Sequence, residues 1–209
     1  AATSERTMAR TWHEVVLNVT HLSSADPTVH AREHYHFSVV LWQVWRVFSP
    51  DASALVSLVD AKFLPKHELV QHFVDESARR ERLDQEIAQA SLAFLTLRFN
   101  GSRLRDQVFD AIEMARVQTR ITADPTSLGA EIGVAVYNWG LLDSSCELEQ
   151  YECSDPARRY VTKNPDRFVP LWDGHGALRD PNHWQRLNIG EFVDKALVTV
   201  QGYPNFTTP

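Results

Sequence analysis

Apolar residues recur at helical spacing through most of the first 142 residues. From Ser4 to about Leu22 they form one stripe, and a second set begins at Asp26-Pro27 and ends at Ser49-Pro50. An aspartate followed by proline is typical of a helix start, and helices usually end before a proline. Further helical patterns lie between residues 66 and 99, 104 and 115, and 124 and 140. This periodicity predicts an all-α fold, a helical bundle.

Local signals mark where the later helices begin and end. Asn100-Gly101-Ser102 predicts a helix end, with Gly101 as a left-handed cap and Ser102 opening the next helix. Asp124-Pro125 repeats the combination of cap and proline. Two segments, Val39–Phe48 and Ile87–Leu95, are apolar on more than one face, which a lone surface helix does not tolerate. We therefore expect these two segments to expose apolar surface or to be covered by a partner.

The composition changes at Asp143. The segment from Asp143 to Pro209 holds six of the ten prolines together with several aromatic residues. Long segments of irregular structure are uncommon in compact domains unless they pack on something or serve a function. We therefore expect residues 1–142 to form the bundle. Residues 143–209 are predicted to form an extended arm, rich in aromatic residues and proline, that wraps the same domain.

Charge and hydropathy argue against two classes of partner. The net charge is −6, the sequence pI is about 5.8, and the sequence has no basic stripe. Nucleic acid is therefore not an expected partner. The longest apolar run, Phe37 to Trp45, is interrupted by Ser38 and Gln43 and is far too short to span a membrane.

The cysteines and the glycosylation sequons bear on the compartment. Cys146 and Cys153 flank a short polar segment and can form a local disulfide in an oxidising setting. Asn18, Asn100 and Asn205 each begin an N-x-S/T sequon, which is a glycosylation acceptor in secreted proteins. Together these features favour a secreted or extracellular protein. The alternative is a soluble cytoplasmic protein with free thiols and chance sequons.

One short motif has the form of a metal site. His30-Ala31-Arg32-Glu33-His34 matches H-x-x-E-H, an inverted zinc-hydrolase motif. On a helix, His30 and His34 lie one turn apart and could share a zinc ion, with Glu33 as the base. No third ligand has positional support in the sequence. The alternative is that His30 and Arg32 are structural polar groups near a helix start and that His34 is exposed.

The order of several short motifs resembles the helical half of a known family. They are Trp12-His13-Glu14-Val15-Val16-Leu17, the helix start Pro27-Thr28-Val29-His30-Ala31-Arg32, the segment from Leu128-Gly129 to Asp143, Asn164-Pro165, and Asp180-Pro181-Asn182-His183-Trp184-Gln185. Together they resemble the N-terminal half of vanadium-dependent haloperoxidases, relatives of the type 2 phosphatidic-acid phosphatases. His13 departs from the asparagine usual at that position in the family.

The resemblance implies that this chain carries none of the family's chemistry. In the family, lysine, arginine, serine and histidine motifs hold vanadate or phosphate, and all of them would lie beyond Pro209. We therefore expect no cofactor in this chain, vanadate in a missing catalytic half, and that half or a second chain as the partner. A homo-oligomer is an alternative arrangement. The other hypotheses are a secreted structural or assembly subunit and the zinc hydrolase based on His30, Glu33 and His34.

Overall fold

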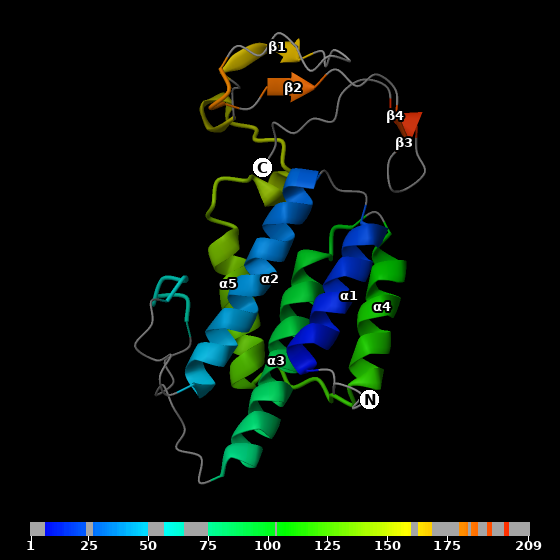
Figure 1. Ribbon diagram of the computed structural model, residues 1–209, viewed down its shortest axis with the longest axis vertical. Coiled ribbons are helices and arrows are strands. Elements are labelled where there is room, and N and C mark those ends of the chain that lie inside the picture. Colours follow the sequence, from blue (N-terminus) through cyan, green and yellow to red (C-terminus); the bar gives the residue numbers. More distant parts are fainter. Residues whose placement is uncertain are drawn as a thin grey trace.

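Five α-helices form the body of the protein in a computed structural model (Figure 1). The structure describes residues 7–23, 27–49, 57–64, 75–102, 104–159, 163–168, 180–183, 185–187, 192–193 and 199–200. The helices are α1 (Met8–Leu22), α2 (Pro27–Phe48), α3 (Glu76–Arg98), α4 (Arg105–Gln118) and α5 (Leu128–Gly140). Helix α3 contacts all four other helices and is therefore the centre of the bundle. The predicted all-α fold is confirmed.

The apolar stripes predicted from the sequence form the helix faces that pack against α3. Trp12, Val16 and Val19 of α1 are buried, as are Val108 and Ile112 of α4. Within each helix, successive buried residues are three or four positions apart, so they lie on one face of that helix. These faces pack with α3 into a single hydrophobic core. Burial of the periodic apolar residues is therefore the main reason that the five helices form a bundle.

Three of the predicted helix boundaries were wrong in detail. Gly101 does not adopt a left-handed conformation, and Ser102 does not cap α4, whose N-cap residue Leu104 makes no side-chain cap bond. Helix α5 begins after Ser127, whose hydroxyl accepts a hydrogen bond from Ala130 N. Asp124 instead accepts from the backbone and hydroxyl of Thr126, within the turn before the helix. Serine and aspartate cap turns and helices by the same bond, so sequence alone did not separate them.

The segments expected to need a partner are mostly covered by the bundle itself. Ile87, Phe94 and Leu95 of α3 are buried within the five-helix core. Within the segment Val39–Phe48 of α2, Val44 and Phe48 are buried and only Trp45 is exposed, at 40%. The expectation that these segments expose apolar surface or need a partner to cover it was therefore wrong, because the neighbouring helices cover most of their apolar side chains. A central helix is apolar on several faces for this reason.

Two glycines allow α5 to lie directly on α3. A Cβ on Gly129 would lie 2.1 Å from the carbonyl oxygen of Glu86, and one on Gly133 would lie 2.4 Å from that of Ala90. Contacts this short cannot form, so the two helix backbones approach closely only because these residues lack side chains. The buried Glu86 also accepts a hydrogen bond from Gly129 N at 2.5 Å. It therefore satisfies one of the free N–H groups at the start of α5.

The segment after α5 contains short turns and short strands. Two 3-10 turns, η2 (Glu147–Glu149) and η3 (Pro156–Arg158), come first. The strands are β1 (Asn164–Phe168), β2 (Gln185–Leu187), β3 (Phe192–Val193) and β4 (Thr199–Val200). Strand β1 pairs in parallel with β2, and β3 pairs antiparallel with β4. Wrapping of residues 143–209 around the bundle stays a prediction, since much of this arm lies outside the described residues.

One expected absence concerns membranes. No helix within the described ranges combines the length and the apolar character that crossing a bilayer requires.

Candidate functional site

Four charged side chains and a histidine from three parts of the chain meet at one end of the bundle. Arg32 and His36 come from α2, Arg98 comes from the last turn of α3, and Asp143 and Glu147 follow α5. We call these five residues the arginine cluster. Arg32, His36 and Arg98 are buried, and only 11% of the Glu147 side chain is exposed. Buried charges are rare unless they are paired, so this is the most unusual polar site among the described residues.

Helix geometry and a glycine bring the cluster together. Arg32 and His36 are four residues apart and therefore lie on the same face of α2. The last residue of α5, Gly140, faces this side of α2 and α3. A Cβ on Gly140 would lie 2.7 Å from ring atoms of His36 and 3.2 Å from Nη2 of Arg98. Any side chain at this position would displace one or both of them.

Arg32 uses every nitrogen of its guanidinium group. Its Nε donates to Asp143 Oδ2 at 2.5 Å, its Nη1 to Glu147 Oε2 at 2.7 Å, and its Nη2 to the carbonyl oxygen of Gly140 at 2.8 Å. Burial alone would lower the pKa of Arg32, but the hydrogen bonds and charges of Asp143 and Glu147 outweigh it and raise that pKa. Burial raises the pKa of Asp143, but hydrogen bonds from Arg32 and Ser145 lower it overall. The arginine therefore stays charged and ties α2 to the segment after α5.

Arg98 makes the second half of the cluster. Its Nη1 donates a short hydrogen bond to the same Oε2 atom of Glu147, and its Nη2 lies 2.8 Å from Nδ1 of His36. A guanidinium group can only donate, so Nδ1 of His36 accepts and the imidazole carries its proton on Nε2. That Nε2 atom lies 3.6 Å from Asp143 Oδ2. Glu147 thus bridges two arginines, and a neutral histidine completes the network.

The neutral state of His36 has a clear electrostatic cause. Burial, followed by the charges of Arg98 and Arg32, lowers the pKa of His36 from 6.5 to about 3, with Asp143 acting in the opposite direction. A histidine that must stay neutral in the folded protein but binds a proton in the unfolded chain links stability to pH.

We expect the free energy of unfolding to fall by about 2 kcal/mol between pH 7 and pH 5 through His36 alone. Unfolded His36 binds a proton near pH 6.5, whereas folded His36 does so only near pH 3. The stabilisation is therefore complete above pH 6.5 and is lost as the pH falls towards 3. Urea unfolding of the wild type and of His36→Gln across this range measures it. The variant should lose this part of the pH dependence, and an unchanged slope would contradict the assignment.

Aromatic rings line the cluster. The guanidinium of Arg98 lies over the rings of Phe94 and Tyr137, at 5.1 and 5.3 Å from their centroids. Arg32 lies 5.9 Å from the ring centroid of Tyr151. Burial, and then the charge of Glu147, raises the pKa of Tyr151 to about 12. The rings exclude water while still interacting favourably with the cations.

The disulfide predicted from the sequence is present and lies beside the cluster. Cys146 and Cys153 are bonded, with 5.3 Å between their Cα atoms, and both are buried. The loop that they close, residues 146–153, contains Glu147 and Tyr151. The covalent link and the buried ion pairs therefore belong to one local structure.

We expect no free thiols when the protein is unfolded without a reductant, and two after reduction. Reduction should lower the free energy of unfolding by about 2–3 kcal/mol, the value expected for closing a loop of about eight residues. Thiol titration in denaturant and urea unfolding with and without a reductant measure both effects. Two free thiols in protein purified without reductant would contradict this expectation.

The arginine cluster does not fit vanadate. An oxyanion site needs donors that are open to the ligand, but Glu147 already fills the space between the two guanidinium groups. Its negative charge would repel a bound vanadate or phosphate. The cluster is therefore an internal junction that holds α2, α3 and the segment after α5 together.

Sequence reasoning missed most of this cluster. It treated Arg32 as a structural polar group, which agrees with the structure, but it did not single out His36, Arg98 or Glu147. The available signal was that the helical period places charged residues on buried faces of α2 and α3. The partners could not be found, because Glu147 is more than 100 residues from Arg32 in the chain.

The residues of the zinc motif are separated by their contacts. His30 is buried, and its Nε2 lies 3.2 Å from the hydroxyl of Ser23. The ring of His34 instead stacks on that of His13 of α1, with 6.1 Å between centroids. Glu33 is buried on α2. In the part of the chain that the structure describes, no group of three or more histidine, cysteine, aspartate or glutamate side chains is arranged to hold a metal ion.

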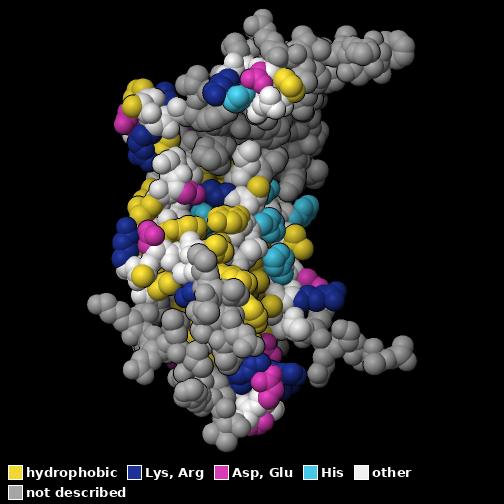
Figure 2. Space-filling model, turned by 60° about the vertical axis from the view of Figure 1, so that its left-hand side comes forward, with side chains coloured by type: hydrophobic (Ala, Val, Ile, Leu, Met, Phe, Trp, Pro, Cys, Tyr) yellow, Lys and Arg dark blue, Asp and Glu magenta, His cyan; other side chains and the backbone are white. Residues whose placement is uncertain are grey.

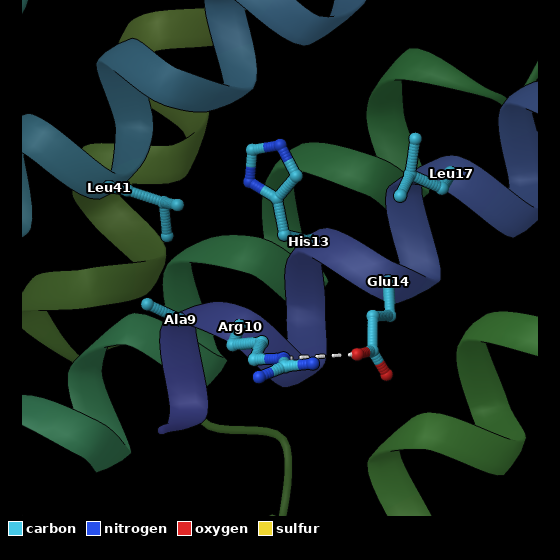
Figure 3. A pocket seen from close by; sticks show the side chains of 6 residues that line it. All are labelled: Ala9, Arg10, His13, Glu14, Leu17 and Leu41. Carbon is cyan, nitrogen blue, oxygen red and sulfur yellow. Dashed lines mark hydrogen bonds and ion pairs between the residues drawn. The ribbon is translucent and has the colours of Figure 1, made fainter. Parts of the chain in front are cut away.

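An open groove runs between α1 and α2. It has a volume of about 440 Å³ and is lined by Ala9, Arg10, His13, Glu14, Leu17 and Leu41 (Figure 3). The imidazole of His13 projects from α1 into the space next to Leu41, and Arg10 pairs with Glu14 at the edge. Several histidines lie close together on one face of the molecule, beside a hydrophobic area (Figure 2). The groove is shallow and holds one isolated ion pair, so its chemistry is that of a contact surface.

Two of the three sequons lie in the described residues. Asn18 is exposed on α1, and Asn100 is exposed in the turn after α3. Asn205 lies outside the described residues. Glycosylation of all three stays a prediction, although an exposed side chain is compatible with a surface glycan.

The resemblance to haloperoxidases also stays a prediction. Comparison of the chain with protein-family models, with curated proteins and with solved structures finds no match. What the protein does must therefore be inferred from its own residues, chiefly from the arginine cluster and the disulfide loop.

Proposed function

We propose that this chain is the non-catalytic helical scaffold portion of a haloperoxidase-like or acid-phosphatase-like protein whose oxyanion site lies on residues outside it. The observation that carries the proposal is the closed arginine cluster. Arg32 donates from all three nitrogen atoms to internal acceptors, and Glu147 is held between Arg32 and Arg98. Such groups fix the relative positions of helices, which is what a scaffold requires.

The partner proposed for this scaffold is the catalytic half of the same protein or a second chain that carries it. Large apolar side chains that are exposed on several helices would supply contact area. They are Leu17, Tyr35, Trp45, Leu97, Met114, Val117 and Val134, together with Leu142 just after α5. Single apolar residues are common on protein surfaces, so these residues support a contact without choosing its position.

The 209-residue chain should show no oxidation of bromide or chloride and no phosphatase activity, even with added vanadate. The reason is that its buried arginines are already neutralised by Glu147 and Asp143. Halide oxidation with hydrogen peroxide and hydrolysis of a phosphate monoester measure both activities. Vanadate-dependent turnover by the purified chain would overturn the proposal.

Isolation of the natural protein provides the positive test. Intact mass and peptide mapping should find sequence beyond Pro209, or a second chain that co-purifies, and that complete protein should oxidise halide or hydrolyse phosphate esters. A natural protein that ends at Pro209 and is inactive would instead support the second candidate, a secreted structural or assembly subunit. The Cys146–Cys153 disulfide favours this second candidate, since such bonds persist mainly in oxidising compartments.

A further inference from the structure

Glu147 reaches the two buried arginines from a loop that folds back on itself. The disulfide closes this loop at Cys146 and Cys153, directly before and six residues after Glu147. Within it, the backbone N–H groups of Glu149 and Tyr151 both donate to the carbonyl oxygen of Cys146, at 2.9 and 3.0 Å. The loop is therefore a compact unit that presents Glu147 and Tyr151 on one side, towards α2 and α3.

The backbone of this loop is held in an unfavourable conformation. Three residues of the loop other than glycine have positive φ angles, namely Cys146 at 58°, Gln150 at 55° and Tyr151 at 65°, and Ser144, two residues before the loop, has a φ of 66°. Only Arg120 shares this property elsewhere in the described residues. Such conformations persist when surrounding contacts enforce them. Two sets of contacts can do so here, the disulfide and the ion pairs of Glu147 with Arg32 and Arg98.

We propose that the Cys146–Cys153 disulfide is a redox-controlled clamp that determines whether Glu147 is held between Arg32 and Arg98. When the bond is closed, the loop keeps the carboxylate between the two guanidinium groups. A dithiol reductant opens it by donating two electrons and two protons, which converts the S–S bond into two thiols while the reductant forms its own disulfide. The loop then relaxes to ordinary backbone angles and withdraws the carboxylate.

Opening of the clamp acts mainly on Arg98. Arg32 keeps Asp143 and the carbonyl of Gly140 as acceptors when Glu147 leaves. The side chain of Arg98 is fully buried, and its only ion pair in the described residues is with Glu147. A buried cation without its partner is strongly unfavourable, so the last turn of α3 opens to admit water. The redox state of the loop is thereby transmitted to the end of the central helix.

The loop is placed where a reductant can act. Both cysteines are nearly covered, at 5% and 7% exposed, but Leu148 within the loop is 76% exposed. The loop therefore lies at the surface, and a local opening gives a dithiol access to the sulfur atoms. This inference does not depend on the proposed scaffold function, since it concerns only the stability of one end of the bundle.

Hydrogen exchange on the full chain, oxidised or reduced with dithiothreitol under folding conditions, tests the clamp. Reduction should speed amide exchange in the last turn of α3, Leu95–Arg98, by at least about tenfold while the centre of α3 remains protected. Cys146→Ser/Cys153→Ser should reproduce the reduced pattern without a reductant, and reoxidation of the wild type should restore the slow exchange.

Two glutamate variants show whether Glu147 transmits the change. In Glu147→Gln the last turn of α3 should exchange rapidly in both redox states, so that reduction adds less than about twofold. Glu149→Gln is the matched control, because Glu149 belongs to the same loop but pairs with Ser154 N and Arg158, away from the cluster. It should respond to reduction like the wild type. Equal responses of the two variants, or reduction that occurs only with global unfolding, would overturn the proposal.

Discussion

Gly133→Leu should destabilise the protein by at least about 4 kcal/mol. A Cβ at this position would lie 2.4 Å from the carbonyl oxygen of Ala90 and 3.2 Å from its Cα atom. The obstacle is the backbone of α3, which cannot rotate out of the way as a side chain can. Overpacking a core usually costs 1–3 kcal/mol, and four added carbon atoms against a fixed backbone should exceed that range. Typical domains are stable by only about 5–15 kcal/mol, so this loss would remove a large share of the total stability.

Thermal and urea unfolding of purified Gly133→Leu measure this effect. Gly101→Leu is the matched control, because a Cβ on Gly101 meets nothing within 4 Å and the residue lies in an exposed turn. The control should stay within about 0.5 kcal/mol of the wild type. Gly129→Leu should behave like Gly133→Leu, since its Cβ would lie 2.1 Å from the carbonyl oxygen of Glu86. A stable Gly133→Leu would show that α5 does not lie directly on α3.

Arg98→Met should lower the free energy of unfolding by about 3 kcal/mol. The substitution keeps an extended side chain of similar length but removes the positive charge from the buried end of α3. Glu147 is then shared with Arg32 alone, and Nδ1 of His36 loses its donor. Breaking a buried ion pair by removing one partner typically costs 3–5 kcal/mol, and the remaining contact with Arg32 places this case at the lower end.

Arg116→Met is the control for the loss of an arginine as such. Arg116 pairs with Glu113 one turn away on α4, where 29% of the Arg116 side chain and 56% of the Glu113 side chain are exposed. Pairs of this kind contribute about 0–1 kcal/mol, so the control should be nearly neutral. Urea unfolding of the two variants gives the comparison directly. Equal effects at both positions would mean that the arginine cluster adds nothing beyond an ordinary surface pair.

The helical body could be predicted from the sequence because its signals are local. Burial of a residue such as Trp12 or Val108 follows from its position in a stripe of period 3.6. Helix ends were predicted less well, since Ser102, Asp124 and Ser127 all have capping side chains and the choice between them depends on the backbone of the turn. The short strands after residue 163 were not predicted. Strands β1 and β2 pair across an intervening segment of the chain, and β3 and β4 have only two residues each, too few for an alternating pattern.

The disulfide shows that a pairing between residues close together in the chain can be predicted without knowing the fold. Cys146 and Cys153 are the only cysteines and lie seven positions apart, so the pairing needed no knowledge of the fold. The zinc motif shows the opposite case. His30 and His34 have the spacing of a metal site, yet one contacts Ser23 and the other stacks on His13. The spacing along a helix fixes which residues share a face, but the neighbouring elements decide what that face meets.

By itself, the sequence determined the fold class and the covalent loop, because each follows from residues that are close together in the chain. The tertiary structure alone decided that α3 is central, that Gly129 and Gly133 allow α5 to lie on it, and that Arg32 and Arg98 share Glu147. These are contacts between residues separated by 40 to more than 100 positions, as in the pairs Glu86–Gly129 and Arg32–Glu147. No local pattern specifies such contacts, since they depend on the packing of all five helices at once.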